Sequence, residues 1–151
     1  MEDLRVKTPC IGVCSTGIGD RVCRGCKRFA HEVIYWNSYS NAEKLLIEQR
    51  LEDFLSRCVR NKLQVVDGDL LRQQLDARRI GYPRHRDSYC QAYCLLKEAA
   101  SQMQDPAEFG LMIDAQYRNM SLREMRLAVD EEFFILSDAY YERYLSSSQL
   151  A

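Results

Sequence analysis

The stretch PCIGVCSTGIGDRVCRGCKR, residues 9–28, decides how the N-terminal part of this chain folds. It holds four of the seven cysteines, spaced as Cys10-x3-Cys14, eight residues, and Cys23-x2-Cys26. It also holds four of the seven glycines, so it is too short and too rich in turns to bury a core unaided. Two close cysteine pairs joined by a short loop suit tetrahedral coordination by four thiolates. We therefore predict a metal-binding loop with these four cysteines as ligands.

The spacing leaves the metal open between zinc and an iron–sulfur cluster. Zinc is favoured because the Cys-x2-Cys turn leads into a predicted helix, and because structural zinc contributes on the order of 10–16 kcal/mol to small modules. A cluster is favoured by the apolar neighbours Ile11, Val13 and Val22, which would shield it from water. The usual cluster pattern, three closely spaced cysteines and a remote fourth, is absent. The spacing favours zinc, with a cluster as the alternative.

Five residues next to the cysteines are candidates for supporting the metal or contacting a partner. Four are basic and offset the negative charge that four thiolates carry, and they also have the simpler interpretation of a solvated surface. The fifth is a histidine that follows the last cysteine by five positions, within reach of a ligand sulfur or else exposed. These residues are Arg21, Arg24, Lys27, Arg28 and His31.

A weaker candidate for a second site lies further along the chain. Cys90 and Cys94 are four residues apart in a predicted helix and therefore share a face, and His85 precedes them. The alternative is that both are small buried residues. His85 belongs to the basic loop 82–86, which either binds phosphate with the help of Arg78 and Arg79 or is a solvated turn.

Helical patterning dominates after residue 28. Apolar periodicity and capping residues predict six helical segments, at about residues 30–36, 40–59, 69–79, 87–103, 105–117 and 121–144. Strand-like alternation is absent from the sequence. We therefore expect a mainly α fold in which a metal-stapled loop or knuckle precedes a helical bundle. The expected division is a metal-binding module with its following helices over residues 1–60 and a helical domain over 61–151.

The cysteine segment resembles a small bacterial family that is described only as a domain of unknown function. The resemblance covers about residues 8–55 and is carried by PCIGVC, residues 9–14, by CRGCKR, residues 23–28, and by Glu32, Trp36, Ser40 and Glu43. Members are often described as predicted iron–sulfur proteins, which implies metal binding but names no reaction.

This chain departs from the family pattern at two positions, neither of which is a ligand. Phe29 stands where the family tends to have threonine, and Val33 stands in place of isoleucine. Residues 60–151 resemble no family known to us. The resemblance therefore implies nothing about the fold or function of that part of the chain.

Composition narrows the functional classes. The net charge is −1, from 21 basic and 22 acidic residues, so no global field attracts the molecule to nucleic acid or to an anionic membrane. No apolar run approaches the ~18 residues of a membrane span, and the opening MEDLRVKTPC lacks the apolar stretch of a secretory signal. We expect a cytoplasmic protein that uses its metal module to bind a protein or RNA partner. The alternative is an iron–sulfur redox or sensor protein. No residue set for catalysis and no small-molecule substrate is indicated.

Overall fold

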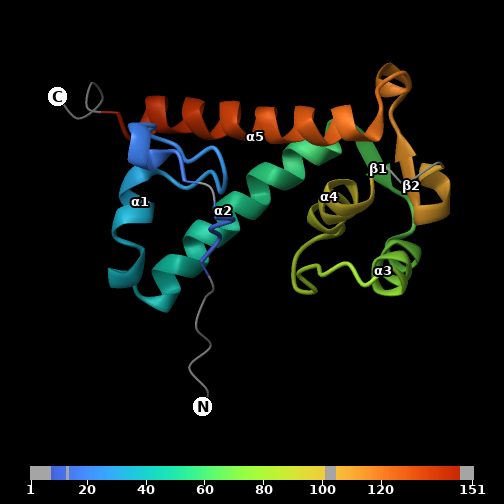
Figure 1. The fold of residues 1–151 in the computed structure, drawn as a ribbon, viewed down its shortest axis with the longest axis horizontal. Helices are drawn as coiled ribbons and strands as arrows, with labels where there is room; N and C mark the ends of the chain where they lie inside the picture. Colours follow the sequence, from blue (N-terminus) through green and yellow to red (C-terminus); the bar gives the residue numbers. More distant parts are fainter. Residues whose placement is uncertain (1–7, 13, 101–104, 147–151) are drawn as a thin grey trace, which may run out of the picture. The chain divides into compact units, whose positions relative to one another are not determined.

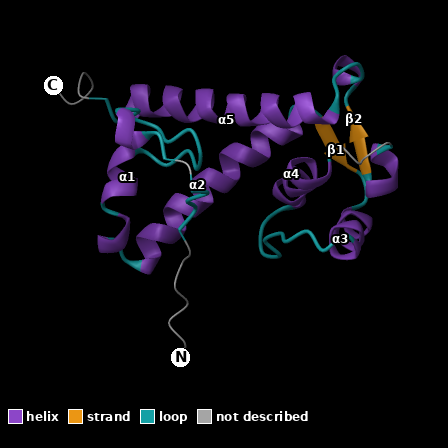
Figure 2. Cartoon of the chain, in the orientation of Figure 1, coloured by secondary structure: helices purple, strands orange, loops and turns teal. Residues whose placement is uncertain are grey.

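A computed structural model describes residues 8–12, 14–100 and 105–146 of the chain (Figure 1). In these ranges most residues are helical, and the only sheet is a pair of short strands (Figure 2). The prediction of a mainly α fold is confirmed. The α-helices are α1 (Ala30–Ile34), α2 (Asn41–Arg60), α3 (Gly68–Ala77), α4 (Ser88–Ala99) and α5 (Leu122–Tyr144). The strands are β1 (Leu63–Val65) and β2 (Leu111–Ile113), and the 3-10 helices are η1 (Thr16–Ile18), η2 (Trp36–Ser38), η3 (Pro106–Phe109) and η4 (Ala115–Tyr117).

The predicted helix starts lie where capping residues place them. Ser40 Oγ accepts the backbone N–H of Glu43 at 3.2 Å, and the Glu43 carboxylate accepts the N–H of Ser40 at 3.1 Å. The side chain of Asp87 accepts two N–H groups at the start of α4, and Ser121 Oγ accepts one at the start of α5. The predicted end of the 87–103 helix falls on residues 101–104, outside the described residues.

One part of the secondary-structure prediction is wrong. Residues 105–117 were predicted to be a helix and the chain to have no strands, but the helix ends after one turn at Gly110, which has φ +74°. The chain then forms β2, which pairs antiparallel with β1 and places Leu63 opposite Ile113. Each strand has three residues, too short for alternation to show in the sequence.

The chain packs as two compact units. Unit 1 comprises residues 1–54 and 133–151, and unit 2 comprises residues 55–132. These units describe which residues pack together in space, whereas the expected domain boundary between residues 60 and 61 divides the sequence. That boundary stays a prediction. The buried apolar side chains of unit 1 include Val22, Phe29, Trp36, Ile47, Leu51, Phe54 and Phe133. Those of unit 2 include Leu63, Leu71, Leu75, Leu95, Leu96, Phe109, Leu111, Met125 and Val129.

In unit 1, the cysteine loop lies alongside the C-terminal half of α5 (Figure 1). Arg21 donates to both carboxylate oxygens of Asp138, at 2.8 and 3.1 Å, and also pairs with Glu142. These hydrogen bonds lower the pKa of Asp138. The loop is therefore held against a long, regular helix. In the described part of the chain, no helix has both the length and the apolar character needed to cross a membrane.

In unit 2, the strand pair and α3 meet at a close backbone approach. The carbonyl of Gly110 accepts the N–H groups of Val66 and Asp67 at 2.8 and 3.2 Å. A Cβ atom added to Gly110 would lie 2.3 Å from the carbonyl oxygen of Asp67, which belongs to the backbone and not to a flexible side chain. Gly110 is thus required both for its positive φ and for this contact.

We predict that Gly110→Ala lowers the free energy of unfolding of unit 2 by about 3 kcal/mol, because it adds a backbone clash to a left-handed conformation. Gly81→Ala is the matched control, since a Cβ there meets no atom within 4 Å. Urea denaturation followed by circular dichroism measures both variants. Equal stability of the two variants would contradict this role of Gly110.

Candidate metal centre

The second cysteine pair lies in a tight turn closed by backbone hydrogen bonds. Lys27 N donates to Cys23 O at 2.8 Å, and Cys23 N donates to Arg28 O at 2.9 Å. Lys27 has φ +67°, a left-handed conformation that is uncommon outside glycine and asparagine. The turn leads into α1 through an isolated bridge between Val22 and Phe29. The sequence therefore forms a knuckle that presents Cys23 and Cys26 on the same side.

The Cys23 sulfur is buried among hydrogen-bond donors. Its residue is 1% exposed, and burial raises the pKa of the thiol. Hydrogen bonds from the backbone N–H groups of Cys26, Ser15 and Gly25, with one from the Cys26 thiol, outweigh burial and lower the pKa to about 7. The turn thus surrounds one sulfur with dipoles that favour a negative charge.

The Cys26 sulfur receives its donor from a side chain. Arg28 Nε donates to Cys26 Sγ at 3.2 Å, and the guanidinium carbon of Arg28 lies 4.9 Å from the ring centroid of Trp36. Burial raises the pKa of the Cys26 thiol, and Arg28 opposes this effect. Arg28 is itself buried, so its charge is held next to the sulfur rather than in solvent.

Lys27 supports the turn from the opposite side. Its ammonium donates to the carbonyl oxygens of Arg24 and Gly25, and lies 5.5 Å from the ring centroid of Phe133 on α5. Because the N–H groups of Gly25 and Cys26 are directed toward Cys23, the carbonyls of the turn need another partner. A lysine that is 1% exposed provides it. Lys27 therefore fixes the peptide orientations on which the donors to Cys23 depend.

The first cysteine pair is more open. Cys10 and Cys14 are exposed; Cys10 Sγ accepts the N–H of Gly12 at 3.4 Å, and Cys14 Sγ lies 2.9 Å from Thr16 Oγ1. Ser15 joins the two pairs, since its Oγ accepts the N–H of Arg24 at 2.8 Å and its own N–H donates to Cys23.

The four sulfurs do not yet form a closed ligand set. Among the described residues, no three of them lie within 4.8 Å of one another. The donor set fits a thiolate-bound metal at Cys23 and Cys26. Completing four-sulfur coordination requires the exposed side chains of Cys10 and Cys14 to turn toward that pair.

The residues predicted next to the cysteines divide into three groups. Lys27 and Arg28 are buried at the turn, whereas Arg21 pairs with α5. Arg24 is exposed, with its guanidinium carbon 4.1 Å from the Phe134 ring centroid and a longer 3.8 Å contact to Asp20. His31 is exposed, and its ring centroid lies 5.9 Å from that of Phe29.

A buried ion pair next to the turn was missed by the sequence analysis. Arg50 on α2 donates to both oxygens of Glu32, each at 2.6 Å, and Glu32 also accepts the N–H of Phe29 at 2.8 Å. The Arg50 guanidinium carbon lies 4.1 Å from the Phe29 ring centroid. The partners are 18 residues apart, in different helices, so no local pattern indicates the pair.

The weaker second-site residues do not come together. Cys90 is buried, Cys94 is half-buried and His85 is exposed. Among the described residues, their three ligand atoms do not lie within 4.8 Å of one another. Burial raises the pKa of the Cys94 thiol.

Comparison with known families finds a match that covers the cysteine segment. Residues 8–55 match the model of the family described as protein of unknown function (DUF1289), in agreement with the resemblance seen in the sequence. The matched range includes all four cysteines of residues 9–28, the buried Glu32 and the half-buried Arg50. No curated protein and no solved structure matches the chain.

We predict that Lys27→Met lowers the affinity for zinc by about 10- to 100-fold, because the carbonyls of the turn lose their buried partner and the donors to Cys23 lose their orientation. Competition with a chromophoric chelator measures the affinity. Lys97→Met, at an exposed lysine of unit 2, is the control and should leave it unchanged. Wild-type affinity in a folded Lys27→Met protein would rule out this role.

Proposed function

We propose that residues 8–55 form a structural metal module in which Cys10, Cys14, Cys23 and Cys26 hold zinc. We further propose that the protein acts in the cytoplasm as a binding module for a protein or RNA partner, without catalysis. The observation that supports the metal most strongly is the convergence of hydrogen-bond donors on Cys23 and Cys26.

Charge and burial at the turn support a bound metal. Three backbone N–H groups are directed at Cys23 and one guanidinium at Cys26, and the two sulfurs are themselves in contact. Donors arranged around metal-bound sulfur orient the ligands and offset their negative charge. Burial disfavours ionisation of the Cys26 thiol, so a negative charge on both sulfurs would cost free energy unless a shared cation were present. A metal ion removes that cost and staples a segment too short to build its own core.

Four thiolates close the coordination sphere of zinc, which favours a structural rather than a catalytic role. The alternative is an iron–sulfur cluster with a redox or sensing role. One observation favours that alternative, namely the N–H groups directed at sulfur, because hydrogen bonds to sulfur help to set the reduction potential of clusters.

At the metal module itself, the surface favours a protein partner over RNA. Of the four neighbouring basic residues, Lys27 and Arg28 are buried and Arg21 is paired with α5. In contrast, several large apolar side chains of unit 1 are half or more exposed, and surface of this type is common at protein interfaces. They are Ile11, Ile18, Ile34, Tyr35, Leu45 and Leu46.

Elemental analysis and a visible spectrum of protein purified without air test the metal. We predict a colourless protein with about one zinc per chain. Iron with visible absorption that bleaches on reduction would favour the cluster, and a folded protein with neither metal would overturn the proposal.

We predict that Cys23→Ser loses the metal and unfolds the cysteine segment and α1, while the helices of unit 2 remain. Cys94→Ser, at a half-buried cysteine outside the ligand set, is the matched control and should retain the metal. Metal analysis and hydrogen exchange of both variants provide the measurement. Full metal content in Cys23→Ser would exclude that cysteine as a ligand.

A further inference from the structure

The connection between α3 and α4 carries a concentration of positive charge that the metal centre does not use. Residues 78–86, RRIGYPRHR, contain four arginines, one histidine and no acidic residue. We define the basic strip as Arg78, Arg79, Arg84 and Arg86. The first three are exposed and Arg86 is half-buried. All four belong to unit 2.

The backbone of this connection is held in place by buried partners. Gln91 of α4 is 1% exposed, and its Nε2 donates to the carbonyl oxygens of Pro83 and Arg86, each at 3.2 Å. At the other end, Ile80 N donates to Leu75 O at 2.9 Å. The arginine positions are therefore set before any ligand arrives, which reduces the entropy lost on binding.

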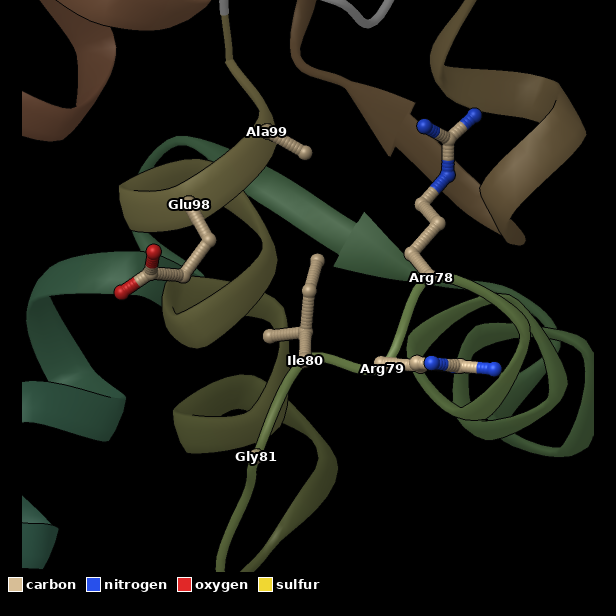
Figure 3. Close-up of a pocket in the computed structure, with 6 residues that line it drawn as sticks. All are labelled: Arg78, Arg79, Ile80, Gly81, Glu98 and Ala99. Atoms are coloured by element: carbon tan, nitrogen blue, oxygen red, sulfur yellow. The ribbon is translucent and has the colours of Figure 1, made fainter.

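The connection runs antiparallel beside α4. Residues 78–81 line a recess of about 350 Å³ together with Glu98 and Ala99, at the C-terminal end of α4 (Figure 3). The contacts of Gln91 lie eight residues earlier in that helix, and a rise of 1.5 Å per residue separates the two ends by about 12 Å. The backbone of the connection is thus extended along α4, while the Arg84 guanidinium reaches back to Asp76 at the end of α3, next to Arg79.

The local conformation at Arg79 places a cation at the end of α3. Arg79 has φ +57°, where glycine is the usual residue after a helix, and its N–H donates to Asp76 O at 3.1 Å. The left-handed conformation is less favourable for arginine than for glycine. Figure 3 shows Arg78 and Arg79 on one side of the recess and the Glu98 carboxylate directed to the other side.

The acidic neighbours leave the strip able to bind an anion. Asp76 pairs with Arg84 at 3.1 Å, but both side chains are more than half exposed, so the pair is weak and exchangeable. Asp87 is engaged in capping α4. The Arg78 guanidinium carbon lies 4.8 Å from the Phe109 ring centroid, and stacking on a ring leaves the N–H edge of a guanidinium free to donate to an oxyanion.

We propose that the basic strip binds the phosphodiester backbone of a single-stranded nucleic acid. Four guanidinium groups carried on one connection can contact several phosphates of the same strand, whereas a small phosphate ligand would occupy only part of them. Guanidinium planes also stack on exposed bases. This site lies outside the metal module, and it identifies one of the two partner classes of the proposed function.

Fluorescence anisotropy with the full-length protein tests the proposal. The probes are a labelled 12-nucleotide RNA, the DNA of the same sequence and the corresponding duplex, each titrated from 50 to 200 mM salt. The strip variant is Arg79→Gln with Arg84→Gln. It should bind the single strands about tenfold more weakly or worse, with a salt slope smaller by about 2. The control, Arg118→Gln with Arg123→Gln, removes the same charge from exposed positions outside the strip and should bind as the wild type. The RNA and DNA arms show which backbone is preferred.

Several results would contradict the proposal that the basic strip binds a single-stranded nucleic acid. These are no binding of either single strand at 50 mM salt, equal losses in the strip and control variants, and displacement of the oligonucleotide by millimolar inorganic phosphate at constant ionic strength. Strip-dependent binding to phosphatidylglycerol vesicles without oligonucleotide binding would assign the strip to a membrane surface instead. The strip variant should keep its metal, and Cys23→Ser should still bind the oligonucleotide. Failure of the nucleic-acid proposal is therefore distinguishable from failure of the metal proposal.

Discussion

The N-terminal unit depends on the hydrogen bonds that surround the Cys23 sulfur. Three backbone N–H groups converge on it, and two come from the turn that ends in Cys26. Such a turn places its carbonyls on the opposite side, where Lys27 donates to those of Arg24 and Gly25. The buried ammonium thus acts at a distance from the sulfur, because it holds the peptides that donate to it. Burial of Lys27 against Phe133 connects the turn to α5.

The rest of unit 1 is arranged around the same turn. Phe29 follows it directly and is fully buried, with its ring stacked on Tyr140 and in edge contact with Tyr141. A threonine at this position would cap α1 with its hydroxyl. In this chain the cap is replaced by aromatic packing against α5. The helix that Phe29 packs against lies outside the matched residues 8–55.

Local chemistry explains which features the sequence predicted. The capping box at Ser40, the helix cap at Ser121 and the glycine-rich cysteine segment depend on residues that are neighbours in the sequence, so the sequence alone indicates them. The strand pair was missed because three residues give no periodicity, and because Gly110 ends a helix that Pro106 begins. The Glu32–Arg50 pair and the burial of Lys27 were also missed, since both depend on segments that only the fold brings together. Basic residues near the cysteines were predicted. The burial of two of those four, Lys27 and Arg28, was not predicted.

We propose that the turn holding Cys23 and Cys26 supplies two of four sulfur ligands to one metal. X-ray absorption spectroscopy at the edge of the bound metal tests it most directly, because it counts the neighbouring atoms and measures their distances. We predict four sulfur neighbours at about 2.3 Å. A shell dominated by nitrogen or oxygen, or one with only two sulfurs, would contradict the claim.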